Sequence, residues 1–140
     1  MTPRNTPPTH SSLLAVSLAM LASACSGDTA PPMPISLTLT DGTQGVFAPS
    51  DVLGVGENMI DVTLMNADGG ALTGQTLVVD AFMPAHGHGL RQPPEVHDMG
   101  GGHYMIHIDF HMTGHWDMSV GLGDGDGDGA PAFSVPLEVQ

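Results

Sequence analysis

Residues His103 to Val120, HYMIHIDFHMTGHWDMSV, have the most regular strand pattern in the chain. Apolar and polar side chains alternate there with a period of two, as in a β-strand with one buried face. The side chains expected to face the core are Tyr104, Ile106, Ile108, Phe110, Trp116, Met118 and Val120. The alternation therefore predicts two strands, 103–111 and 115–120.

The short segment between these strands predicts a hairpin. Met112-Thr113-Gly114 has the length of a three-residue hairpin loop, with glycine at the position that needs a positive φ. The expected cross-strand pairs are Phe110 with Trp116, His111 with His115, Asp109 with Asp117, and His107 with Ser119. Opposed Cβ atoms lie about 4.5–5.5 Å apart, so the paired histidines are close enough to share a metal ion. The alternative is that these outward positions are simply solvated.

Four further runs of alternating residues predict the rest of the fold: 35–40, 57–66, 75–83 and 133–139. Glycine and proline clusters separate these runs as turns. Pro136 cannot donate a hydrogen bond to a neighbouring strand, so we expect the last strand at a sheet edge. The mature chain has no helical periodicity of useful length. The prediction is an all-β fold, an immunoglobulin-like antiparallel β-sandwich of about seven strands.

The N-terminal part has the features of an export signal. Residues 1–12 are polar and include Arg4, and residues 13–24 (LLAVSLAMLASA) are an apolar run that ends in small residues. The run is too short for a permanent membrane helix, which needs about 20 residues. Leu21-Ala22-Ser23-Ala24-Cys25 resembles a bacterial lipobox, which implies lipidation of Cys25. The alternative is an ordinary secretory signal with an incidental cysteine.

This interpretation divides the chain into three parts. They are a lipoprotein-type signal peptide (1–24), a proline-rich tether (25–34) and one folded domain (35–140). The expected location is the cell envelope, at the outer membrane or the periplasmic face. The expected partners are the membrane, through lipidated Cys25, and an envelope protein.

The charge of the chain excludes nucleic acid as a partner. Fifteen acidic residues stand against two arginines and no lysine, for a net charge of −13. Such a surface repels phosphate backbones and raises the local concentration of cations. The apolar content of 41%, together with the strand patterning, predicts a packed core rather than a disordered chain.

Seven of the eight histidines and five of the ten methionines lie between Met83 and Met118. Because the strand ending at Met83 and the strand starting at His103 border one loop, we expect a first candidate metal site of Met83, His86, His88, Met99 and His103. A second candidate, expected at the opposite end of the sandwich, comprises His111, His115, Asp109 and Asp117. Thioether with imidazole favours Cu(I), whereas imidazole with carboxylate suits Cu(II) or zinc. The alternative for the first candidate is a structural loop whose histidines bond to backbone.

Three segments carry a family resemblance: Met83-Pro-Ala-His-Gly-His-Gly89, Gly102-His-Tyr104 and Met112-Thr-Gly-His-Trp116. In them the chain resembles the YtkA-like domain family of exported bacterial proteins. The resemblance implies a small, membrane-anchored immunoglobulin-like sandwich placed near copper handling. Its recurring features fall here on Met83, His86, His88, Gly102, Tyr104, Met112, Gly114 and Trp116. The first three are expected to carry chemistry, whereas Gly102, Tyr104, Gly114 and Trp116 are expected to be architectural.

Two other functions are disfavoured. Asp124-Gly-Asp-Gly-Asp-Gly129 resembles the start of an EF-hand loop, but its twelfth position is Val135 instead of a bidentate Glu. No nucleophile with a supporting base and oxyanion donor is evident, so we do not expect an enzyme. The sequence thus predicts an envelope lipoprotein that binds copper or another soft metal. The alternative is a structural or protein-interaction module of the envelope without metal.

Overall fold

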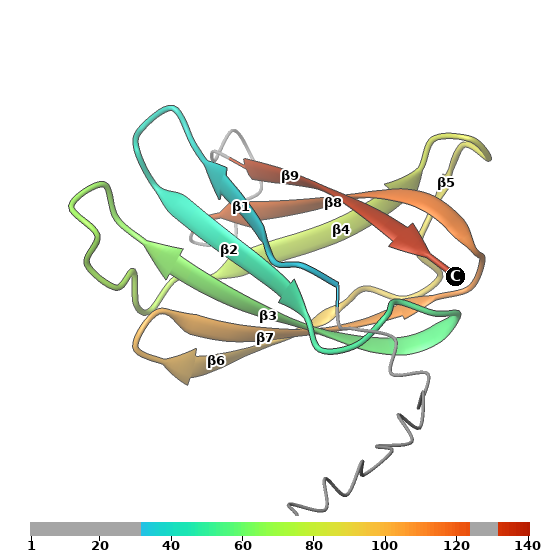
Figure 1. Cartoon of the computed structure of the whole chain (residues 1–140), viewed down its shortest axis with the longest axis horizontal. Coiled ribbons are helices and arrows are strands. Elements are labelled where there is room, and N and C mark those ends of the chain that lie inside the picture. Colours follow the sequence, from blue (N-terminus) through green and yellow to red (C-terminus); the bar gives the residue numbers. More distant parts are fainter. Residues whose placement is uncertain (1–31, 124–131) are drawn as a thin grey trace, which may run out of the picture.

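The computed structural model describes residues 32–123 and 132–140, which form nine β-strands in two layers (Figure 1). The strands are β1 (Ile35–Thr38), β2 (Gln44–Pro49), β3 (Gly56–Met65), β4 (Leu77–Met83), β5 (His88–Gly89), β6 (Glu95–Gly100), β7 (His103–Phe110), β8 (Gly114–Leu122) and β9 (Ala132–Val139). These described residues contain no helix that could cross a membrane. The predicted signal peptide, Cys25, most of the tether and the 124–129 turn lie outside the described residues.

The strands form two antiparallel sheets. One has the order β1-β2-β3-β7-β6 and the other the order β5-β4-β8-β9. The predicted all-β immunoglobulin-like sandwich is therefore confirmed, with nine strands in place of about seven. The last strand, β9, lies at a sheet edge as Pro136 predicted.

The core lies between the two sheets and contains the predicted inward residues. Tyr104, Ile106, Phe110, Trp116 and Met118 are each at most 1% exposed. Two aromatic pairs lie across the core, with ring centroids 5.3 Å apart for Phe47 and Phe133 and 5.2 Å apart for Phe110 and Trp116. Burial of each such side chain stabilises the fold by about 1.5–3 kcal/mol, before the entropy cost of ordering the chain.

Three strands, β2, β5 and β6, were not predicted from the sequence. In β2, Gly45 and Pro49 occupy buried positions, so the apolar alternation is interrupted. A side chain at Gly45 would meet the rings of Phe47 and Phe133 at about 3 Å, which explains why the position is glycine. In β6 only Val96 packs against the core, and one apolar residue gives no period.

The predicted hairpin between the two best-patterned strands is wrong. β7 pairs with β3 and β6, whereas β8 pairs with β4 and β9, so residues 111–113 cross from one sheet to the other. The alternation of inward and outward residues is the same for a hairpin and for a crossing between the sheets, because Phe110 and Trp116 point inward in both. Only the partners of the outward residues differ: Asp109 lies opposite Glu57, and His115 lies opposite Glu138. Gly114 does have the expected positive φ, at 122°.

Candidate metal site

The H-x-H segment is a tight return at the end of β4. The backbone amides of His86 and Gly87 both donate to the carbonyl of Met83, at 3.2 and 2.9 Å. Gly87 has φ 68°, a conformation that favours glycine, and the chain then pairs back on β4 as β5. In that pairing His88 lies opposite Met83, whose side chain is only 1% exposed. Since opposed residues share a face of the sheet, His88 projects toward the core side.

Three imidazoles gather at this end of the sandwich. The ring centroids of His86 and His88 are 5.8 Å apart, and those of His88 and His111 are 5.0 Å apart. The indole of Trp116 lies beneath them, with its ring centroid 5.8 Å from that of His88 and 5.4 Å from that of His111. His111 therefore belongs with His86 and His88, and its predicted place at the far end of the sandwich is wrong.

His111 has an unpartnered polar atom. Its Nδ1 is buried and has no hydrogen-bond partner within the described residues. An orphaned buried polar atom costs about 1–3 kcal/mol, so it calls for an explanation such as an absent ligand. Burial, with the nearby charges of Arg91 and His88, lowers the pKa of His111, although Asp109 opposes the shift. A lowered pKa favours the neutral form of the ring, which is the form that binds metals.

Two methionines border the same end. Met83 lies inside the core, and a Cβ at Gly114 would come within 3.4 Å of its Cε. Met112 is half-buried against the core, and its carbonyl accepts a hydrogen bond of 3.1 Å from the Trp116 Nε1. The indole thus fixes the backbone between His111 and Gly114, and both methionines lie at the end of the sandwich where the three histidines gather.

The spacing of the rings is compatible with a shared ion. Two imidazoles bonded to one metal at about 2.0–2.1 Å, at trigonal or tetrahedral angles, have centroids roughly 5–5.5 Å apart. His88 Nδ1 lies 3.3 Å from the carbonyl of Gly89, a contact that leaves its Nε2 for a ligand. Among the described residues, however, no three His, Cys, Asp or Glu side chains already converge as a metal site. A site made of all three imidazoles would therefore need a change in ring orientation, and His86 is the exposed one of the three.

Met99 and His103 do not belong to this cluster. The chain leaves the loop through β6, so the β6–β7 turn lies at the opposite end of the sandwich from β5 (Figure 1). Seven residue steps of β7 separate His103 from Phe110, roughly 23 Å at 3.3 Å per residue. There His103 Nδ1 lies 3.2 Å from the hydroxyl of Thr63. The first candidate site was too large because β6 was not foreseen.

The second candidate site is also divided by the fold. His115, on β8, bonds through Nδ1 to Glu138 at 2.7 Å and through Nε2 to Asp117 at 3.1 Å. The hydrogen bond that His115 donates to Glu138 raises the pKa of His115, Asp117 adds to the effect, and burial opposes it. Asp109 lies on the other sheet, opposite Glu57. Glu138 was missed in the sequence, although its outward position in the last strand could have indicated it.

The four residues expected to be architectural lie at turns or in the core. Gly102 has φ 81°, and a Cβ there would lie 2.7 Å from the carbonyl oxygen of Leu64. The buried Tyr104 hydroxyl donates to the carbonyl of Leu72 and accepts from the amide of Gln75, both at 3.0 Å. Gly114 and Trp116 hold the crossing between the sheets, as described above.

The fold and this loop define a small immunoglobulin-like β-sandwich with a histidine-rich end. Residues 40–121 match the YtkA-like family, and the chain belongs to that family. The resemblance drawn from the three sequence segments is thereby confirmed. No curated protein matches the sequence.

The chain is similar to several solved structures at low sequence identity. The chain is similar to the Lin-41 filamin domain, with 12% identity, a TM-score of 0.48, and coverage of 79% of this chain and 98% of that one. It is also similar to the Yersinia pseudotuberculosis adhesin InvE, with 20% identity, a TM-score of 0.48, and coverage of 68% and 26%. Domains 4 and 5 of the S-layer protein SbsC give 16% identity, a TM-score of 0.44, and coverage of 76% and 53%.

Proposed function

We propose that this domain binds Cu(I) through His86, His88 and His111, with thioether sulfur from Met112 or Met83 completing the site. The observation that carries the proposal is the ring cluster itself, in which the buried His111 Nδ1 has no partner within the described residues. A ligand at that nitrogen would remove the cost of the orphaned atom. We refer to these three histidines as the loop cluster.

The donor types favour a soft ion. Neutral imidazole and thioether together suit Cu(I) better than Mg²⁺ or Ca²⁺, which prefer oxygen ligands. The division of roles follows from burial. His111 and His88 would be fixed ligands held against Trp116, whereas the exposed His86 would close over the ion. An exposed outer ligand suits a protein that accepts an ion and passes it on.

The cellular setting is part of the proposal. Export and lipidation of Cys25 would place the domain at the envelope, where an acidic surface of net charge −13 would attract cations. We propose handling of copper there rather than catalysis.

Titration of the chain with Cu(I), against a chelator of known affinity, tests the loop cluster. The double variant His86→Ala/His88→Ala should lose the equivalent bound at this end. The matched control is His103→Ala, which removes an exposed histidine at the other end of the sandwich and should bind as the wild type does. Equal stoichiometry and affinity in the double variant and the wild type would refute the site. Absence of any binding would favour an envelope interaction module.

A further inference from the structure

The outer face of the five-stranded sheet carries a second group of soft donors. In the register of β3, β7 and β6, His107 lies between Met59 and Glu95. One row further along, Met105 lies between Asp61 and His97. We call His97, His107, Met59 and Met105 the sheet-face cluster. None of these residues belongs to the loop cluster or to either candidate site predicted from the sequence.

All four side chains point away from the core. Their strand neighbours Ile60, Ile106 and Val96 pack inward, and alternate residues of a strand face opposite sides. Met59 is 47% exposed, His97 is exposed, and Met105 and His107 are half-buried. Exposed strand positions usually carry polar side chains. Core packing therefore does not account for the methionines at positions 59 and 105.

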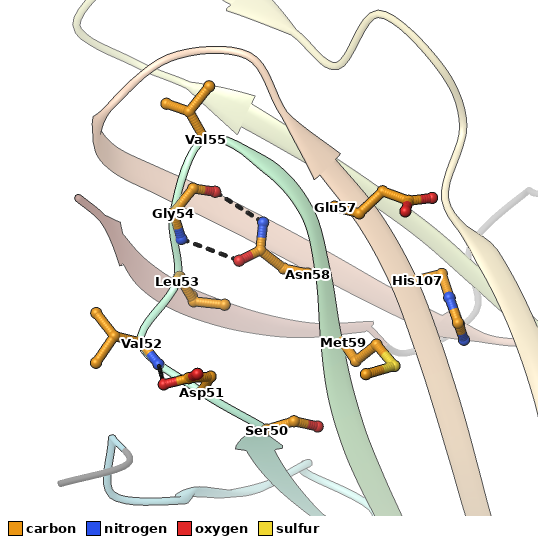
Figure 2. Close-up of a pocket in the computed structure, with 10 residues that line it drawn as sticks. All are labelled: Ser50, Asp51, Val52, Leu53, Gly54, Val55, Glu57, Asn58, Met59 and His107. Atoms are coloured by element: carbon orange, nitrogen blue, oxygen red, sulfur yellow. Dashed lines mark hydrogen bonds between the residues drawn. The ribbon is translucent and has the colours of Figure 1, made fainter. Parts of the chain in front are cut away.

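The donors are close enough to share one ion. The ring centroids of His97 and His107 are 5.1 Å apart, with the rings nearly perpendicular at 79°. Opposed Cβ atoms in such a sheet are about 4.5–5.5 Å apart, so Met59 reaches His107 and Met105 reaches His97. Figure 2 shows Met59 and His107 on adjacent strands, beside the pocket that the 50–55 loop borders.

The chemistry of the four donors selects the class of ion. Among the described residues no three His, Cys, Asp or Glu form a metal group, so the thioethers are needed to complete a site here. Two imidazoles and two thioethers are a donor set for Cu(I) or Ag(I). Glu95, whose carboxylate lies 3.9 Å from His97 Nε2, and Asp61 add negative charge beside them.

We propose that the sheet-face cluster is a second, independent site for a soft monovalent cation, with Cu(I) as the ion and Ag(I) as a redox-inert probe. The site lies on the outer face of one sheet, whereas the loop cluster caps the end of the core. His107 and His111 are four residues apart, which corresponds to roughly 13 Å of extended chain. The two sites therefore bind separate ions.

The test uses the full chain and the conservative double variant Met59→Leu/Met105→Leu, which removes the sulfurs and nearly keeps the volume. The control is Met33→Leu, which removes an exposed methionine that precedes β1 and lies outside the three strands of the cluster. The wild type and the control should bind two equivalents of Cu(I), and the double variant one. With Ag(I), the ¹³C methyl resonances of Met59 and Met105 should shift, and that of Met33 should not.

The outcomes separate this site from the loop cluster. His86→Ala/His88→Ala should also bind one equivalent, and the combined fourfold variant none. Two equivalents in Met59→Leu/Met105→Leu, or unmoved Met59 and Met105 methyl resonances, would overturn the proposal. If the wild type binds one equivalent that only His86→Ala/His88→Ala removes, the sheet-face site is refuted. If only Met59→Leu/Met105→Leu removes it, the sheet-face site stands and the loop cluster fails. No binding at all refutes both.

Discussion

The imidazoles of His88 and His111 lie with their ring centroids 5.0 Å apart, above the buried indole of Trp116. His88 belongs to the short edge strand β5, and His111 to the segment that crosses between the sheets. Their proximity exists only in the folded sandwich. A metal that binds both residues would tie the edge of one sheet to the crossing segment, and so would stabilise the native state against unfolding.

His111→Leu separates a functional histidine from a structural one. The variant removes a buried nitrogen that has no partner within the described residues, so we expect the free energy of unfolding without metal to stay equal or rise by about 1 kcal/mol. The Cu(I) affinity of the loop cluster should fall at least tenfold. Urea unfolding and chelator competition measure the two quantities. A variant that is less stable and binds copper normally would show that His111 serves only packing.

Stability should depend on pH through His115. Because Glu138 and Asp117 raise its folded pKa above the ordinary value, the folded state holds the proton more tightly than the unfolded state. This stabilisation is fully present below the unfolded pKa of about 6.5 and is lost as pH rises through the folded pKa. We expect the difference in unfolding free energy between wild type and His115→Gln to be larger at pH 5.5 than at pH 8.5. An equal difference at both pH values would contradict the view that Glu138 and Asp117 stabilise the protonated form of His115.

Gly102→Ala and Gly100→Ala form a matched pair. Both glycines have positive φ, at 81° and 83°, so both substitutions carry a backbone cost of about 1 kcal/mol. At Gly102 the new Cβ would also lie 2.7 Å from the Leu64 carbonyl, whereas at Gly100 it would meet nothing within 4 Å. Gly102→Ala should therefore be the more destabilising by at least 1 kcal/mol in urea unfolding. Equal losses would mean that the contact with Leu64 relaxes freely.

Tyr104→Phe tests the buried hydroxyl that links β7 to the 72–75 segment. The substitution leaves the Leu72 carbonyl and the Gln75 amide without their side-chain partner. We expect a loss of about 1–3 kcal/mol in the free energy of unfolding, with the β-sheet circular dichroism unchanged. A loss below about 0.5 kcal/mol would show that water replaces the hydroxyl.

Much of the fold could be predicted because the two-residue alternation is strong where a strand has a full buried face. Tyr104, Ile106, Ile108 and Phe110 illustrate this in β7, and all four are buried. The alternation carries no information about which strand pairs with which. Phe110 and Trp116 face the core both in a hairpin and in a connection that crosses between the two sheets. The sequence pattern is the same for these two connections, and the predicted hairpin was the wrong one.

The site was predicted in part for a related reason. The spacing and the family resemblance single out His86 and His88, and their ring centroids lie 5.8 Å apart after the tight return. His111 was separated from them because β6, with Val96 as its only residue packed on the core, gave no signal. Once β6 is counted, the chain crosses the sandwich once more. That additional crossing places His111, instead of His103, at the end of the sandwich where His86 and His88 lie.

The pair of single variants His111→Ala and His103→Ala tests the loop cluster most directly. The Cu(I) affinity of the loop cluster, measured by chelator competition on the full chain at pH 7, should fall at least tenfold in His111→Ala. It should remain within about twofold of wild type in His103→Ala, because that ring lies at the far end of β7 beside Thr63. Unchanged affinity in His111→Ala, with the loss found in His103→Ala instead, would contradict the loop cluster.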